Sequence, residues 1–322
     1  MTINVAVVSA EALVLGCDSI STVTEYFINP FARPSELIGP ENYQVAFTMS
    51  DLMPLVTNVW SGVTKMFALS SDERTPVAAV TAGLARLNSR SMKSYADEFL
   101  RDKAANTLVQ HTVEEVAHNF LTFMRRHYER HYANSPLPPE LRDGPAFLLG
   151  GYDAASHLPT LFRMNVKDNR VLPEYAPGTF GITWDGQSDA VERVLHGYDA
   201  NLRGSVESHA RDITNASSRK LQDLPDRGSV PSLQDFVTEL ADSPRFRIDW
   251  GKFQCKIACE NLPVQDSIDL AAYVVELQSG KEKFSKGIGA VGGRTHIGLL
   301  RKHEGFQMLD EPDFHYTRVR TA

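Results

Sequence analysis

Short runs of β-branched and apolar residues come in pairs along the chain. Polar connections separate the members of each pair, which is typical of β-hairpins. The first pair covers 3–8 and 12–17, and Ser9-Ala10-Glu11 joins them. Hairpin spacing of this kind predicts antiparallel sheets. Further strands are predicted at 65–69 with 77–81, 146–152 with 158–166, 179–184, 252–260, 287–300 and 305–310.

Helical patterns alternate with these strand pairs. The clearest covers 112–132, where Thr112 and Glu115 form a capping-box pattern before apolar residues spaced three and four apart. Because sheets alternate with helix pairs, we expect helices that cover two packed sheets. Other helices are predicted within 86–105, 185–197, 200–245 and 264–279, with a capped helix at 232–242. Loops are predicted at the proline-rich segments 27–42 and 135–145. The segment 43–63 could form a strand or a short helix.

Composition places the chain among globular proteins. It has 322 residues, 42% hydrophobic and 23% charged, which excludes disorder, collagen and coiled coil for the whole chain. Lys and Arg number 33 against 40 Asp and Glu, a net charge of −7, so a nucleic-acid partner held by bulk positive charge is not expected. Three cysteines cannot form a disulfide scaffold, and the odd number favours a reducing compartment.

Membrane and export signals are not expected. The longest apolar stretches, such as 146–152, are far shorter than the roughly 20 residues that cross a bilayer. The N-terminal segment has no basic region, and Glu11 and Asp18 interrupt its apolar run. We therefore predict a cytoplasmic protein without a membrane partner.

Candidate chemistry begins at Thr2. Methionine removal would expose it, and an N-terminal threonine carries a nucleophilic hydroxyl and a basic amine on one residue. The reference pKa of such an amine, about 7.7–8.0, is close to neutral pH. Asp18 ends the second strand of the first hairpin, Lys65 begins the next hairpin, and Gly83 ends it. Because a hairpin brings its far ends together, Thr2 and Asp18 are expected to be neighbours, with Lys65 between them.

Each of these residues also has an ordinary interpretation. Asp18 could cap a turn, Lys65 could be a surface charge, and Gly83 could simply open a helix. Ser188 could be the N-cap of a helix. Their order behind Thr2 favours the functional interpretation.

This order of motifs resembles the proteasome β-type N-terminal nucleophile (Ntn) hydrolases. Members of that family begin with Thr, then carry a Gly-x-Asp-Ser strand end, a Lys, and Ala-Gly before the first long helix. Among bacterial branches the chain is most similar to the betaproteobacterial proteasome homologue, with the ancestral β-subunit type called Anbu second. The matching residues are Thr2, Gly16-Cys17-Asp18-Ser19, Lys65, Ala82-Gly83, Gly150-Gly151-Tyr152-Asp153, Gly186-Gln187-Ser188 and Gly292-Gly293.

The resemblance implies an α+β fold, a four-layer α/β/β/α sandwich of two antiparallel sheets. It implies one domain over 1–322, with insertions near 24–63 and 200–260. It implies a threonine peptidase without cofactor or metal, assembled into stacked homo-oligomeric rings, seven-fold in preference to six-fold, that act on peptides or unfolded proteins. Nothing in the sequence names an unfoldase that would feed the rings.

The resemblance also implies a role for each catalytic residue. Thr2 attacks the peptide carbonyl, and its amine takes the proton. Lys65 lowers the pKa of the nucleophile and the amine, and Asp18 orients Lys65. The Gly83 N–H binds the oxyanion, and Ser188 helps to hold the amine.

The chain departs from the family at its last glycine pair. Ile288 and Val291 replace the Asp and Ser of the usual Asp-x-x-Ser-Gly-Gly support. This departure motivates two alternatives: a ring-forming scaffold or binding protein with little or no peptidase activity, and an Ntn amidase that acts on a small amide.

Three other patterns are weaker. His127 and His131 are four residues apart on a predicted helix, but they fit a solvated helix face better than a zinc site. Cys255 and Cys259 lie on a predicted strand, about 13 Å apart, and are interpreted as core or interface residues. The glycine-rich run 287–293 lacks the following Lys-Ser/Thr of a phosphate loop.

Overall fold

A computed structural model describes residues 2–28, 52–70, 72–105, 111–135, 137–222, 248–285, 289 and 291–309. The chain divides into two compact units, Met1–Gln187 with Ala258–Ala322, and Ser188–Ile257. The predicted insertion near 200–260 falls mostly in the second unit. The predicted helix 232–242 lies outside the described residues, as does Ile288.

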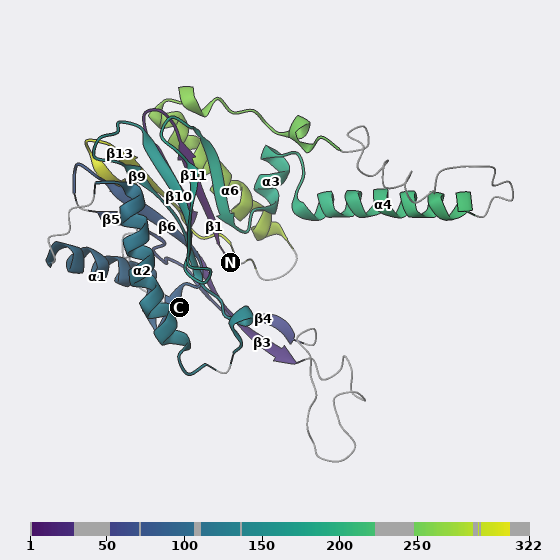
Figure 1. The fold of residues 1–322 in the computed structure, drawn as a ribbon, viewed down its shortest axis with the longest axis horizontal. Coiled ribbons are helices and arrows are strands. Elements are labelled where there is room, and N and C mark those ends of the chain that lie inside the picture. Colours follow the sequence, from purple (N-terminus) through teal and green to yellow (C-terminus); the bar gives the residue numbers. More distant parts are fainter. Residues whose placement is uncertain are drawn as a thin grey trace, which may run out of the picture. The chain divides into compact units, whose positions relative to one another are not determined.

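The first unit contains two five-stranded antiparallel sheets, so the fold mixes helices with antiparallel sheet as predicted (Figure 1). The first sheet joins early and late segments of the chain, because residues 295–300 pair with residues 13–18. In sheet order, its strands are β12 (Gly181–Gly186), β1 (Ile3–Val8), β2 (Leu13–Asp18), β13 (Thr295–Arg301) and β14 (Gly305–Met308).

The second sheet is built from the predicted strand pairs of the middle of the chain. It also contains β11, which the sequence pattern did not reveal, because most of its residues are exposed or half-buried rather than apolar on one face. In sheet order, its strands are β11 (Arg170–Tyr175), β10 (Pro159–Asn165), β9 (Pro145–Tyr152), β6 (Val77–Gly83) and β5 (Met66–Ser70).

Helices of the first unit pack against different sheets (Figure 1). The helices α1 (Met92–Ala105) and α2 (Val113–Tyr132) contact β5, β9 and β10, and their aromatic side chains form one core with that sheet. The helix α6 (Val264–Phe284) contacts β1, β2 and β13. A second core joins apolar residues of both sheets, such as Leu15 and Leu148. The polar end of this second core holds the residues discussed below.

The N-terminus of α2 confirms its predicted capping box. The Thr112 side chain accepts from the Glu115 N–H at 3.2 Å, and the Glu115 carboxylate accepts from the Thr112 N–H at 3.3 Å. These bonds satisfy two of the N–H groups that a helix start leaves without partners. The 3₁₀ helix η2 (Pro139–Leu141) follows within the predicted loop.

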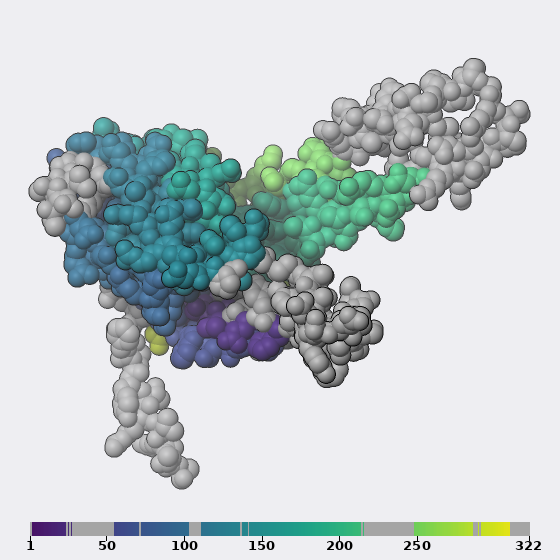
Figure 2. Space-filling view, turned by 60° about the horizontal axis from the view of Figure 1, so that its bottom comes forward, coloured from purple at the N-terminus to yellow at the C-terminus, as the bar shows by residue number. Residues whose placement is uncertain are grey.

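Two small ribbons complete the first unit. The strands β3 (Ser21–Ile28) and β4 (Leu52–Trp60) pair with each other, and their purple and indigo atoms adjoin in Figure 2. Strands β7 (Arg86–Leu87) and β8 (Arg90–Ser91) form a tight hairpin. The predicted helix therefore begins at residue 92 rather than 86, because Asn88 and Ser89 adopt positive φ angles of 47° and 65°, as a two-residue hairpin turn requires.

The second unit is mainly helical. It contains α3 (Asp189–Leu195), α4 (Ala200–Gln222) and the 3₁₀ helix η3 (Trp250–Phe253). The predicted strand 252–260 is wrong: η3 and η4 (Cys259–Asn261) occupy its two ends. Residues 251–256 are exposed, so the alternating pattern has no sheet to join.

Candidate active site

Thr2 lies directly before β1 and is only 5% exposed. Its carbonyl accepts a hydrogen bond from the Gln187 N–H at 2.7 Å. Gly186 has φ +90°, and a Cβ there would lie 2.1 Å from the Thr2 carbonyl oxygen. Only glycine fits so close to this backbone, so the Gly186-Gln187 turn after β12 fixes the position of Thr2.

Asp18 ends β2 beside Thr2. Its Oδ1 accepts from Thr2 Oγ1 at 2.5 Å and from the Ile3 N–H at 3.1 Å. Its Oδ2 accepts from the N–H groups of Ile20 and Gly292, both at 3.1 Å. The residue is fully buried. These bonds compensate for the burial of the carboxylate and restrict its orientation.

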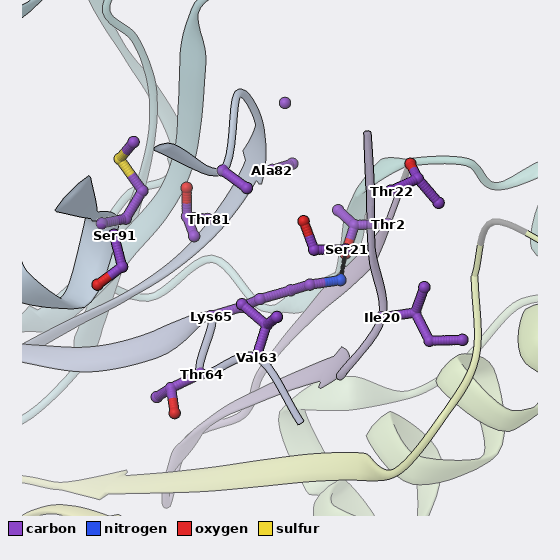
Figure 3. Close-up of a pocket in the computed structure, with 13 residues that line it drawn as sticks. Thr2, Ile20, Ser21, Thr22, Val63, Thr64, Lys65, Thr81, Ala82 and Ser91 are labelled. Carbon is purple, nitrogen blue, oxygen red and sulfur yellow. Dashed lines mark hydrogen bonds between the residues drawn. The ribbon is translucent and has the colours of Figure 1, made fainter. Parts of the chain in front are cut away.

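Lys65 directly precedes β5 and is 4% exposed. Its Nζ donates to Asp18 Oδ1 at 2.7 Å and to Thr2 Oγ1. The Thr2 hydroxyl therefore accepts from an ammonium group and donates to a carboxylate. A cation in hydrogen-bond contact with a hydroxyl favours its deprotonated form, which is the nucleophilic form. Figure 3 shows the Lys65 side chain extending to Thr2.

Gly83 is the last residue of β6 and has φ +76°. A Cβ at this position would lie 2.5 Å from the Gly144 carbonyl oxygen, so the site requires glycine. The predicted strand-to-helix turn is wrong in one respect, because the β7–β8 hairpin stands between Gly83 and α1.

A small pocket of about 40 Å³ opens beside Thr2 and Lys65 (Figure 3). Gly83 lines it too, so three of the predicted site residues, from separate parts of the sequence, meet there. Apart from Lys65, its lining is uncharged and rich in hydroxyl groups. The other lining residues are Ile20, Ser21, Thr22, Val63, Thr64, Thr81, Ala82, Ala85, Ser91 and Met92.

Ser188 is the N-cap of α3 and belongs to the second unit. Its hydroxyl donates to Glu192 Oε1 at 2.8 Å, one turn along the same helix. Ser188 therefore occupies the N-cap position of its ordinary interpretation, but its side chain makes no capping hydrogen bond to a backbone N–H. Its role beside Thr2 stays a prediction.

The Gly292-Gly293 pair supports Asp18, which the sequence did not reveal. Besides the bond from Gly292 to Asp18, the Ser19 N–H donates to the Gly292 carbonyl at 3.1 Å, and the Arg294 N–H donates to Ser19 Oγ at 2.8 Å. A Cβ on Gly293 would lie 2.5 Å from Ser19 Oγ. The signal was present in the sequence as Asp18-Ser19 and Gly292-Gly293, but only folding joins the two motifs.

His127 and His131 of α2 contact neighbouring aromatic rings and backbone groups. His127 packs against the rings of Tyr95 and Phe123, and His131 Nδ1 accepts from the Asn88 N–H at 3.2 Å. Cys259 is buried, whereas Cys255 is exposed. Among the described residues, no three His, Cys, Asp or Glu side chains are grouped as metal ligands would be.

In the described part of the chain, no helix is long and apolar enough to cross a membrane.

No protein-family model and no curated protein matches the sequence. Solved structures of Anbu proteins are similar in fold. The Anbu (Gly-1) mutant from Hyphomicrobium sp. strain MC1 has a TM-score of 0.48 and 7% identity, covering 96% of this chain and 87% of its own. Anbu (ancestral beta-subunit) from Yersinia bercovieri has a TM-score of 0.47 and 10% identity, with the same coverage. Anbu is the branch that the sequence placed second, behind the betaproteobacterial homologue. At these values the likeness transfers no activity or assembly to this chain.

Proposed function

We propose that this chain is a threonine-type N-terminal nucleophile hydrolase that cleaves peptide bonds after removal of Met1. One observation carries the proposal: a buried Thr2 hydroxyl lies in hydrogen-bond contact with both Lys65 and Asp18, at the edge of a pocket. Burying an ion pair costs desolvation free energy, so such a pair is better explained by function than by stability. This pair contacts the Thr2 hydroxyl, and removal of Met1 would place a free amine on the same residue.

In the proposed reaction, Thr2 Oγ attacks the carbonyl carbon, and the hydroxyl proton passes to the Thr2 amine. The Gly83 N–H donates to the oxyanion that forms. Collapse of this intermediate breaks the C–N bond, the leaving amine takes the proton, and Thr2 keeps the acyl group as an ester. Water then attacks the ester and gives a proton to the Thr2 amine; the Oγ–acyl bond breaks, the acyl group leaves as a carboxylic acid, and the amine returns the proton to Thr2 Oγ. One oxyanion donor is typically worth 10²–10³ in rate, about 3 kcal/mol.

The finer architecture and assembly belong to the same proposal. Helices on the outer faces of two packed sheets are consistent with a four-layer α/β/β/α sandwich, as one domain with insertions near 24–63 and 200–260. We propose stacked homo-oligomeric rings, seven-fold in preference to six-fold, in the cytoplasm. Native mass spectrometry of the purified chain would give the number of subunits, and a monomer would contradict the ring and favour a small-amide hydrolase.

Intact mass spectrometry with a threonine-directed probe tests the chemistry. The expected result is loss of Met1 and addition of one β-lactone or epoxyketone per chain, mapped to Thr2. Thr2→Ala should abolish labelling, whereas Thr64→Ala, at another threonine of the pocket wall, should keep it. Retained Met1, or a processed Thr2 that takes no probe, would contradict the proposed function and favour the scaffold alternative.

A further inference from the structure

A row of four side chains, three of them polar and the fourth a buried thiol, crosses the first sheet just behind Thr2. Asp185 on β12 is opposite Asn4 on β1, Asn4 is opposite Cys17 on β2, and Cys17 is opposite His296 on β13. Directly opposite residues of antiparallel strands share one face of the sheet. This face carries Ala6 and its apolar neighbours into the core between the two sheets. The row is therefore a polar layer at the end of an apolar core.

Asn4 is the member of the row that lies next to the proposed nucleophile. Side chains two residues apart on an extended strand share a face and are separated by about 6.6 Å, so Asn4 follows Thr2 on one side of β1. Cys17, its neighbour on β2, directly precedes Asp18. Burial raises the pKa of the Cys17 thiol to about 12, and the nearby charges of Lys65 and Asp18 act on the same thiol. The row thus borders the Lys65–Asp18 pair.

The Asn4 amide is buried at an energetic cost. Its exposed fraction is 0%, and among the described residues neither its Oδ1 nor its Nδ2 has a hydrogen-bond partner. A buried polar group without a partner costs about 1–3 kcal/mol, which an apolar side chain of the same size would avoid. A second such atom, Asp185 Oδ2, belongs to the residue directly opposite.

The hydrogen-bonding needs of the Asn4 amide are complementary to those of Asp185 and Lys65. Its Nδ2 needs an acceptor, and Asp185 Oδ2 needs a donor. Its Oδ1 needs a donor, and the Lys65 ammonium has three N–H groups, for which Thr2 Oγ1 and Asp18 Oδ1 are the two acceptors within the described part of the chain. Internal waters typically bridge buried polar groups of this kind.

We propose that Asn4 is a positioning residue of the Thr2 site, where it links the Lys65 ammonium to Asp185 through buried water and so holds that ammonium against Thr2 Oγ1. This inference rests on the proposed function, because it assigns Asn4 to the machinery of the same nucleophile. Asn4 does not touch the substrate; it acts through Lys65.

The test compares labelling of Thr2 with folding stability. We expect Asn4→Leu, which keeps the size and removes the polar atoms, to slow β-lactone labelling of Thr2 by about tenfold to a hundredfold, because Lys65 loses its alignment. Its unfolding midpoint in urea should stay the same or rise, since the buried amide is removed. Asn4→Ser leaves room for water beside a hydroxyl and should recover most of the labelling rate.

Thr160→Val is the matched control. Thr160 is 4% exposed, and its hydroxyl also has no partner among the described residues. It lies at the far end of the second sheet, because it pairs with Gly151, whereas the Gly83 end of β9 is at Pro145. The six-residue separation along β9 corresponds to about 20 Å. Labelling of Thr160→Val should equal that of the wild-type chain.

Each outcome decides between the possibilities. A labelled wild-type chain with an equally labelled Asn4→Leu variant would overturn the positioning role alone. Slow labelling of both Asn4 variants, together with a lower unfolding midpoint, would assign Asn4 a structural role and also overturn the proposal. A wild-type chain that is processed but takes no label would overturn the proposed function, and the positioning role with it.

Discussion

Two pairs of opposite charges in the first unit differ in their access to water. The side chains of Lys65 and Asp18 are 6% and 1% exposed, whereas those of Arg163 and Glu174 are 30% and 27% exposed. Both pairs lie at the interface of the two sheets. The first pair contacts the Thr2 hydroxyl, and that difference separates the proposed catalytic site from a link between strands.

The Arg163 cluster joins strands of different sheets. From β10, Arg163 donates to Glu174 on β11, and also to Thr183 Oγ1 and the Trp184 carbonyl on β12, both at 3.1 Å. Because water reaches this cluster, its ionic part contributes little, and its hydrogen bonds contribute most of what it adds. The Lys65–Asp18 pair has far less access to bulk water, so the groups buried around it set its geometry. Buried charge of this kind is weak evidence for stability and better evidence for function.

Lys65→Met should have the largest effect. It removes the ammonium and leaves the Asp18 carboxylate buried beside Thr2, so we expect labelling of Thr2 to fall by about 10³ or more and stability to fall by about 3 kcal/mol. Labelling rates and urea unfolding measure the two effects. Arg163→Met, from the other pair, should lower the labelling rate far less, because Arg163 reaches the site only through its 3.5 Å ion pair with Asp185. Equal loss of labelling in both variants would erase the distinction between the two pairs.

Asp18→Asn is the next largest change. It keeps the shape of the side chain but removes the charge that balances Lys65, and one of its two acceptor oxygens becomes a donor. We expect labelling to fall by about 10², because Thr2 Oγ1 and Lys65 Nζ both bond the same Oδ1. Glu174→Gln, the matching change in the exposed pair, should leave labelling unchanged. Rapid labelling of Asp18→Asn would show that the carboxylate only fills space.

Gly83→Ala moves the test from side chains to the backbone beside Lys65. A Cβ there meets the Gly144 carbonyl at 2.5 Å and requires φ +76°. We expect a loss of about 1–3 kcal/mol in the free energy of unfolding, with slower labelling. Gly204→Ala in α4 is the control, because nothing lies within 4 Å of its Cβ, and it should be neutral or stabilising. An unchanged unfolding midpoint for Gly83→Ala would contradict the required conformation.

The smallest effect concerns pH and the Arg163 pair. Burial alone would raise the pKa of Glu174, but hydrogen bonds from Arg163 and Thr183 and the charge of Arg163 hold it below its ordinary value of 4.5. A lowered pKa in the folded state contributes stability above the unfolded value, which is lost as pH falls through the folded value. Acid unfolding should therefore lose this contribution below about pH 4.5, and Glu174→Gln should remove it. An identical pH dependence in the variant would exclude this contribution.

Local pattern was sufficient where an element depends on its own residues. The first hairpin and the capping box of α2 follow from side-chain period and cap chemistry, and both are confirmed. Prediction was wrong where a strand-like pattern did not become part of a sheet. Alternation at 252–260 fits a strand, but those residues have no neighbouring strand to bond. Positive φ at Asn88 and Ser89 replaced the first turns of a predicted helix with a hairpin.

The sequence by itself determined the chemical parts of the candidate site: Thr2 directly after Met1, and Asp18, Lys65 and Gly83 at the ends of predicted strands. Residue type and strand position are local properties, so they can be read along the chain. Only the tertiary structure decided that Gly292 holds Asp18 and that Asn4 is opposite Asp185. Those contacts depend on the register between strands that are distant in sequence, and register is set by the packing of the whole sheet.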